Sequence, residues 1–449
     1  MKRANVFLGM IIFTVAGLSA QTISLEQVRT LALANSRSLA KSNLAIQSVA
    51  LEEKSRVYSN LPSLSLGASA SMTLWSAANA APVENPVDTF SAGASVSVSQ
   101  RIFEGGKSNI QKAINQILSE SARKDALAEF FTVLDSADSA YYAVLEAAAT
   151  LEAEESSLQT SLTSLSIAEV RQASGMLNQG DYLKVLAEKE ARENSRNQAR
   201  RNLALSITKL KAIIGLSSVP DLEQVEFDRF EDLILRLGNV SDTDADSLYN
   251  QLWVLLAAAN PSLAVAGLST QRAEKNLSMA KTAYSPTLSA SFSTGLNYTP
   301  DRGMEMSAGR VSLSASIPVD YWVIANNVEK SRLSLDQTAL DYSIRETALE
   351  TELQSTVLNA LTDAGSVLSS RRALEYAKKH FEFVMERYRL AQSSVSDLED
   401  ASILLINSRN SHTRARYGFL QSLSKLRSLC AIDDEDRLVK LLMGNQESP

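Results

Sequence analysis

Residues able to support catalysis or metal binding are scarce in this chain. Its 449 residues include one cysteine, Cys430, and two histidines, His380 and His412, which lie in helical runs without ligand-type neighbours at useful spacing. A structural zinc site needs about four such ligands. Gly106-Lys107-Ser108 looks like the end of a phosphate-binding loop, but Arg101 stands where that loop requires its first glycine. We therefore expect no enzyme activity, no metal site and no cofactor.

Composition narrows the class of protein further. Acidic side chains outnumber basic ones by 51 to 44, which gives a formal net charge of −7. A nucleic-acid-binding protein needs a basic face, so we expect no nucleic-acid partner. Only 17 glycines and 9 prolines accompany a surplus of Ala, Ser and Leu. This composition excludes collagen-like and low-complexity chains and indicates long helices.

The first 20 residues have the pattern of a secretory signal peptide. Lys2 and Arg3 precede the apolar run Val6–Leu18, and small residues lead to Ala20, after which we expect cleavage. A transmembrane anchor is the alternative, but a helical span needs about 20 apolar residues. No later stretch is long and apolar enough for such a helix, so we expect an exported protein without a helical anchor.

The sequence contains an internal duplication. Aligned residues lie 224 positions apart near the start of the two halves and 216 apart near their ends, as in Leu44 with Leu268, Pro62 with Pro286, and Asp181 with Asp397. Separated matches at nearly constant spacing indicate a repeat. We predict five segments: a signal peptide (1–20), a first repeat (21–215), an acidic linker (216–247), a second repeat (248–432) and a C-terminal tail (433–449).

Each half shows the same order of periodicities: a helix, two strands, a long helix and a shorter helix. The first helix is expected from Ser24, with Gln27 completing a capping box, to about Asn60. Apolar residues then alternate with Ser or Gly, which predicts strands over about 63–75, 90–102, 287–299 and 307–318. Helical spacing predicts the remaining main helices over about 106–173, 181–215, 326–392 and 397–431.

Prolines and glycines mark the junctions between helices and strands. Pro62 and Pro286 end the helix that precedes the first strand of each half. Gly105 and Gly106 follow the second strand, and Pro318 closes the fourth. We expect these positions to fix where the chain passes between helix and sheet.

The predicted dimensions are unusual for a globular domain. Helices of 65 to 70 residues would be about 100 Å long, whereas globular helices average three to four turns. The two-faced strands suit tilted strands that cross a bilayer, although a half-buried soluble sheet shows the same alternation. Four strands cannot close a barrel, and open edges are not tolerated in lipid. If the strands span a membrane, several chains must pool them, and three chains would supply twelve strands.

At this point the sequence resembles the TolC-like outer-membrane efflux protein family. The resemblance is carried by the order of elements, given twice, and by three motifs: Ser99-Gln100-Arg101-Ile102-Phe103-Glu104-Gly105-Gly106, Ala140-Tyr141-Tyr142-Ala143-Val144-Leu145 and Ile317-Pro318-Val319-Asp320. Arg101 replaces the family's proline, and Tyr321-Trp322 replaces the glycines in the second half. The resemblance implies a mainly α fold with a small β part: a long helical coiled-coil tunnel plus four strands per chain in a twelve-stranded outer-membrane barrel.

The resemblance also implies partners and a location. It implies a homotrimer embedded in outer-membrane lipid, with a long periplasmic portion. It further implies a periplasmic adaptor and an inner-membrane transporter of the RND, ABC or MFS type. The expected function is a passive exit duct of a tripartite efflux or type I secretion system. The alternative is a secreted periplasmic coiled-coil scaffold with no transport activity.

The residues expected to matter most lie at the helix–helix turns. Asp397 and Asp400 fall on the aspartates that form two rings at the family's periplasmic entrance, and Asp181 occupies the corresponding turn of the first half. Such rings would attract cations. The alternative is helix capping, with Ser396 and Glu399 as a capping box. Ser393 stands where the family often has a basic latch residue, a role open to Arg387 or Arg389.

Overall fold

The computed structural model describes residues 22–73, 89–300 and 302–444. The chain divides into two compact units, and each unit takes segments from both halves of the sequence. The sheet unit comprises 40–128 and 261–348, and the helical unit comprises 1–39, 129–260 and 349–449. The predicted signal peptide lies outside the described residues.

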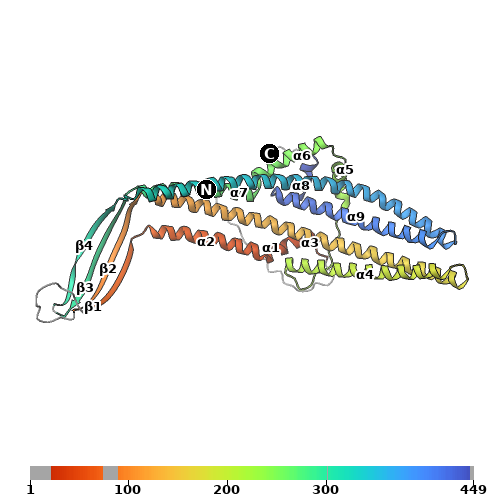
Figure 1. Cartoon of the computed structure of the whole chain (residues 1–449), viewed down its shortest axis with the longest axis horizontal. Helices are drawn as coiled ribbons and strands as arrows, with labels where there is room; N and C mark the ends of the chain where they lie inside the picture. The colour runs from red at the N-terminus through yellow and green to blue at the C-terminus, as the bar shows by residue number, and fades with distance from the viewer. Residues whose placement is uncertain (1–21, 74–88, 301, 445–449) are drawn as a thin grey trace. The chain divides into compact units, whose positions relative to one another are not determined.

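A four-stranded antiparallel sheet forms the β part of the sheet unit (Figure 1). The strands pair in chain order: β1 (Ser63–Thr73), β2 (Thr89–Glu104), β3 (Thr287–Thr299) and β4 (Gly303–Ser316). The four predicted strands are therefore confirmed. β4 begins earlier than the predicted residue 307, because Thr299 pairs with Gly303, whose φ of +70° suits a glycine at the end of a hairpin.

The pairing register gives the sheet one polar and one apolar face. Serine lies opposite serine, and the hydroxyl oxygens of Ser63 and Ser99 are 2.7 Å apart. The alternate residues point to the other face, where Leu66 is 77% and Val311 80% exposed. A soluble antiparallel sheet packs its apolar face on a core. The described residues leave this apolar face uncovered, which is the condition that a lipid-facing surface requires.

Glycines build the passage from sheet to helix. Gly105 and Gly106 lie between β2 and α3 (Lys107–Ala173), with φ of +59° and +82°. A Cβ on Gly105 would lie 2.5 Å from the Cβ of Ser285. Both the backbone conformation and the close approach therefore require glycine at position 105.

Prolines lie at the other junctions. Pro62 and Pro286 come directly before β1 and β3, and Pro318 lies between β4 and α8 (Tyr321–Arg389). α8 begins before the predicted residue 326, so its first turn carries the exposed Tyr321 and Trp322. These two residues are therefore helical, just beyond the sheet.

The first predicted helix is interrupted, so the expectation of one helix from Ser24 to about Asn60 is wrong. The structure has α1 (Leu25–Asn35) and α2 (Arg37–Ser59). Ser36 between them is extended, with a ψ of 113°, and its hydroxyl accepts a hydrogen bond from the backbone N–H of Leu39 at 3.1 Å. Ser36 therefore ends α1 and caps α2. The predicted capping box of Ser24 and Gln27 is present.

Helices make up the rest of both units. The sheet unit also contains α7 (Pro261–Lys281), and the other main helices are α4 (Gln179–Ile214), α5 (Glu231–Leu237), α6 (Asp242–Ala259), α9 (Val395–Leu429) and α10 (Glu435–Leu442). α5 and the start of α6 lie in the stretch predicted only as an acidic linker. Among the described residues, no single helix passes a length-and-hydropathy test for a membrane span; one bent pair, Thr243–Ala259 with Pro261–Tyr284, passes when taken together.

A buried ionic cluster ties the helical unit together. Asp138 of α3 is fully buried and accepts hydrogen bonds from Arg29 Nε of α1 at 2.7 Å and from Arg427 Nη2 of α9 at 2.8 Å. The Ser424 hydroxyl donates a further hydrogen bond at 2.7 Å. Arg29 also lies 3.4 Å from Glu435 of α10. Residues from the start, middle and end of the chain are therefore held at one buried carboxylate.

Candidate gate at the paired helical turns

Two helix–turn–helix connections in the helical unit are built alike. The α3–α4 turn leaves its helix through Gly175 at φ +74°, and the α8–α9 turn does so through Ala391 at φ +58°. A side chain then caps the next helix: the Asn178 side-chain oxygen and the Ser394 hydroxyl each accept a hydrogen bond from the backbone N–H three residues on. The duplication seen in the sequence therefore extends to the geometry of the two turns.

Asp397 is part of a helix cap. Its Oδ2 accepts hydrogen bonds from the Ser394 backbone N–H at 2.9 Å and from the Ser393 hydroxyl at 3.0 Å, and its own N–H donates to Ser394 Oγ at 3.1 Å. The Ser394 contacts, followed by that of Ser393, lower the pKa of Asp397. The predicted capping box of Ser396 and Glu399 is wrong, because the helix begins at Val395 and Ser394 is its cap.

Asp181 occupies the equivalent place in the first turn. Its backbone N–H donates to Asn178 Oδ1 at 2.8 Å, and its Oδ2 accepts from Asn178 Nδ2 at 2.7 Å. Lys184 Nζ lies 3.9 Å from the other carboxylate oxygen. Asp181 therefore also serves its helix terminus, as the capping alternative predicts.

Asp400 differs from both of these residues. It lies one turn further along α9, is exposed, and makes no side-chain hydrogen bond or ion pair with another described residue. Of the three predicted aspartates, Asp400 is the one whose carboxylate is left fully available to a cation.

The candidate latch residues contact their own turn. Arg387 Nη2 donates to the backbone oxygen of Gln392 at 3.2 Å and its guanidinium lies over the Phe383 ring, 5.7 Å from the centroid. Arg389 lies 3.9 Å from Glu386 one turn earlier in α8. The Ser393 hydroxyl donates to Asp397. Among the described residues these side chains make no ion pair with α3 or α4.

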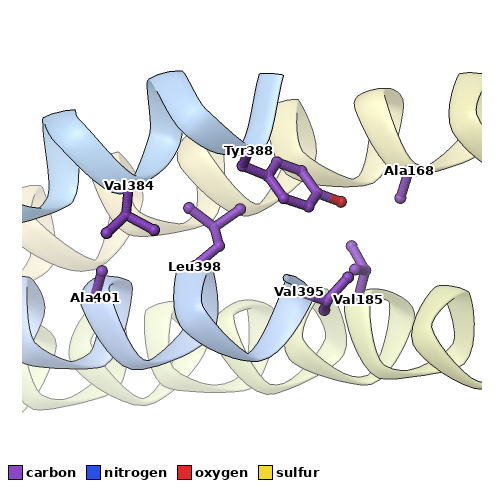
Figure 2. Close-up of a cluster of buried hydrophobic side chains, with 7 residues drawn as sticks. All are labelled: Ala168, Val185, Val384, Tyr388, Val395, Leu398 and Ala401. Carbon is purple, nitrogen blue, oxygen red and sulfur yellow. The ribbon is translucent and has the colours of Figure 1, made fainter. Parts of the chain in front are cut away.

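A hydrophobic cluster next to the turns joins four helices (Figure 2). This turn cluster takes residues from α3, α4, α8 and α9: Ala168, Val185, Val384, Tyr388, Val395, Leu398 and Ala401. Tyr388 is fully buried, and the guanidinium carbon of Arg171 lies 4.9 Å from the centroid of its ring. Burial raises the pKa of the Tyr388 hydroxyl. The aromatic ring of α8 is thus stacked against a cation of α3 beside the turns.

Sequence reasoning missed Tyr388 and Arg171. The signal was present in the spacing of buried residues along α8, where Ala377, Val384 and Tyr388 are seven and four positions apart. This spacing indicates a seam that packs on a neighbouring helix. The identity of that neighbour depends on the tertiary fold, so the partner Arg171 was not readable from α8 alone.

Comparison with known proteins places the chain in a family. The family model described as outer membrane efflux protein matches residues 28–216 and 252–431. The chain belongs to the outer membrane efflux protein family. Outer membrane protein TolC of Escherichia coli (strain K12) is 22% identical over 406 residues, which cover 85% of this chain and 76% of TolC.

Solved structures of outer membrane channels share the fold. CusC superimposes with a TM-score of 0.75 at 15% identity, over 94% of this chain and 95% of CusC. The outer membrane channel CmeC of Campylobacter jejuni gives a TM-score of 0.75 at 17% identity, over 94% and 90% of the two chains. VceC of Vibrio cholerae gives a TM-score of 0.74 at 14% identity, over 90% of this chain and 95% of VceC.

Family membership confirms the predicted fold class and function. The protein is an efflux channel of the outer membrane, with a helical portion in the periplasm. This assignment separates it from the alternative of a secreted scaffold without transport activity. It also agrees with the uncovered apolar face of the sheet, since the strands of such a channel meet lipid.

Proposed function

We propose that three copies of this chain close a twelve-stranded barrel and act as a passive exit duct, gated at the paired turns. The duct takes its cargo from an inner-membrane transporter of the RND, ABC or MFS type through a periplasmic adaptor, in tripartite efflux or type I secretion. The chain itself performs no catalytic step and uses no cofactor. The observation that carries this proposal is the exposed two-faced sheet with two open edges.

Barrel closure follows from the sheet's unpaired edges. Among the described strands, β1 and β4 each have one neighbour, so one edge of each lacks hydrogen-bond partners in the sheet. Backbone groups left unpaired in lipid cost several kcal/mol each, and pairing β4 of one copy with β1 of the next removes both edges. With three copies the apolar face carrying Leu66 and Val311 meets lipid, and the serine face lines the lumen.

The turns supply the gate. Opening must move α8 and α9 relative to α3 and α4, because the turn cluster and the Arg171–Tyr388 contact hold these helices together. Asp397 and Asp181 keep the helix ends in place. Threefold repetition of Asp400 gives a ring of carboxylates that binds cations.

The test is electrical recording on purified protein. Outer-membrane fractions should yield a detergent-stable oligomer of three chains that conducts in planar bilayers. Divalent cations added on the side of the turns should block it, and Asp400→Asn should weaken this block by about tenfold while leaving the oligomer intact. Asp397→Asn is the matched control, because its carboxylate is committed to the helix cap. A soluble monomer, or a protein that forms no channel, contradicts the exit-duct proposal; block that is insensitive to Asp400→Asn contradicts the ring.

A further inference from the structure

An acidic groove lies in the helical unit, remote in sequence from the turns. Its volume is about 440 Å³, and it is lined by the start of α1, by Tyr141 and Tyr142 of α3, by residues 223–230 and by the start of α10. Seven acidic and two basic side chains line it. This excess of carboxylates is what a cationic ligand would meet.

The two arginines of the groove are already paired. Arg29 is held by Asp138 at 2.7 Å and lies 3.4 Å from Glu435, and Arg229 lies 3.2 Å from the other oxygen of Glu435. By contrast, the exposed carboxylates of Glu223 and Glu226, and that of Asp433, make no ion pair or side-chain hydrogen bond with another described residue. Three carboxylates on two segments therefore remain free.

Tyr142 provides an independent sign of a ligand. It lines the groove although its side chain is only 3% exposed, and its hydroxyl has no hydrogen-bond partner among the described residues. Burial, followed by the nearby carboxylates of Glu435 and Asp138, raises its pKa, so the phenol stays protonated. Buried tyrosine hydroxyls normally have a partner, and the adjacent Tyr141 hydroxyl does donate to the backbone oxygen of Glu223. The Tyr142 hydroxyl therefore opens into the groove, where it can bond a group that enters there.

We propose that this acidic groove docks an arginine- or lysine-bearing segment of a periplasmic protein. The cationic head pairs with Glu223, Glu226 and Asp433, and one of its N–H groups donates to the Tyr142 hydroxyl. The groove exceeds the volume of a bare metal ion, and the described residues contain no group of three His, Cys, Asp or Glu side chains able to hold one. A peptide segment satisfies both the spread of charge and the volume.

The test uses the mature, detergent-solubilised protein and a labelled peptide. The probe is fluorescein-Gly-Arg-Gly-Arg-Gly-Arg-Gly, and the reference is the same peptide with citrulline for arginine. Fluorescence anisotropy should show binding of the arginine peptide only. The combined substitution Glu223→Gln, Glu226→Gln and Asp433→Asn should weaken it about tenfold, and Tyr142→Phe, which changes no charge, about fivefold.

The matched control removes equal charge elsewhere on the helical unit. Glu152, Glu155 and Glu169 of α3 are exposed and lie outside the groove, so their joint substitution by Gln should change the affinity by less than about twofold. Equal binding of the citrulline peptide, an equal loss in the control variant, or unchanged affinity in both groove variants overturns the proposal. If the triple variant does not fold, Tyr142→Phe decides alone. Channel conductance should be unaffected by the groove variants, so this result is separate from that of the exit-duct proposal.

Discussion

Replacing Tyr388 by alanine tests whether the turn cluster holds the gate closed. Tyr388 is fully buried among Val384, Val395 and Leu398 and stacks against Arg171. Truncating a buried aromatic side chain to alanine costs about 3–5 kcal/mol. If the cluster forms only in the closed state, 3 kcal/mol shifts the closed-to-open ratio by a factor on the order of 100 per chain. Tyr388→Phe keeps the ring and the cation–π contact, so this variant should shift the closed-to-open ratio by less than about tenfold.

The assay is single-channel recording in planar bilayers, with the open probability as the readout. Leu420→Ala is the matched control, because Leu420 is 1% exposed in α9 but lies outside the turn cluster. Leu420→Ala should lower the melting temperature without opening the channel, whereas Tyr388→Ala should do both. If the two variants lose similar stability and leave the open probability unchanged, the cluster persists in the open state and the reasoning is refuted.

Three further predictions follow from single contacts. Asp138→Asn leaves the buried Arg427 without its counter-charge and leaves Arg29 only its longer ion pairs with Glu435 and Glu26, so it should cost about 3–5 kcal/mol, seen as a lower melting temperature of the helical circular dichroism signal in detergent; an unchanged melt contradicts the role of the ionic cluster. Arg310 projects from the serine face of β4 without an ion pair among the described residues. Arg310→Ser should therefore raise the cation-to-anion permeability ratio, obtained from the reversal potential, by roughly twofold at 0.1 M salt; an unchanged ratio would place Arg310 outside the lumen. Burial lowers the pKa of His412 to about 4, so the folded protein keeps this side chain neutral, and stability should fall as the pH drops from 6.5 toward 4. His412→Gln should therefore show a smaller fall in melting temperature between pH 7 and pH 5 than the unchanged protein. An equal fall in both proteins would refute the assignment.

The sheet could be read from the sequence because its determinants are local. Alternation of serine with apolar residues has a period of two, and this period alone fixes which residues share a face. The register confirms this, with Ser63 opposite Ser99 and Leu64 opposite Val98. The start of β4 was placed too late, because Gly303 to Met306 is a short segment directly after the turn and its pairing depends on β3.

The cap of α9 shows why helix ends are harder to predict. The sequence offers two overlapping capping boxes, Ser394 with Asp397 and Ser396 with Glu399. Only Ser396 with Glu399 matches the usual Ser/Thr-x-x-Glu/Gln pattern, so local reasoning favours the pair that the structure does not use. The structure chooses Ser394, since Val395 must be helical to bury its side chain in the turn cluster, where it is 6% exposed. Tertiary packing therefore decides which serine becomes the cap.

Long-range contacts were outside the reach of sequence patterns. Arg29 and Asp138 are 109 positions apart, and Asp138 and Arg427 are 289 apart. Nothing in their local sequence distinguishes these charges from solvated ones. The same limit applied to the stretch read as an acidic linker, where Phe230 and Leu233 are buried in short helical turns that the surrounding charges obscured.

The two turns differ in charge, and this difference bears on the proposed cation ring. At the offset that aligns Asp181 with Asp397, Lys184 aligns with Asp400. In the first turn the lysine lies 3.9 Å from its aspartate, so the pair is neutral, whereas the second turn carries three carboxylates, Asp397, Glu399 and Asp400, and no such lysine. Because Asp397 is engaged by Ser393 and Ser394, Asp400 is the aspartate of this turn that remains available to an ion. The two turns therefore share one hinge geometry, but Glu399 and Asp400 stand where the first turn has Leu183 and Lys184, and these two differences make the second turn the more acidic one.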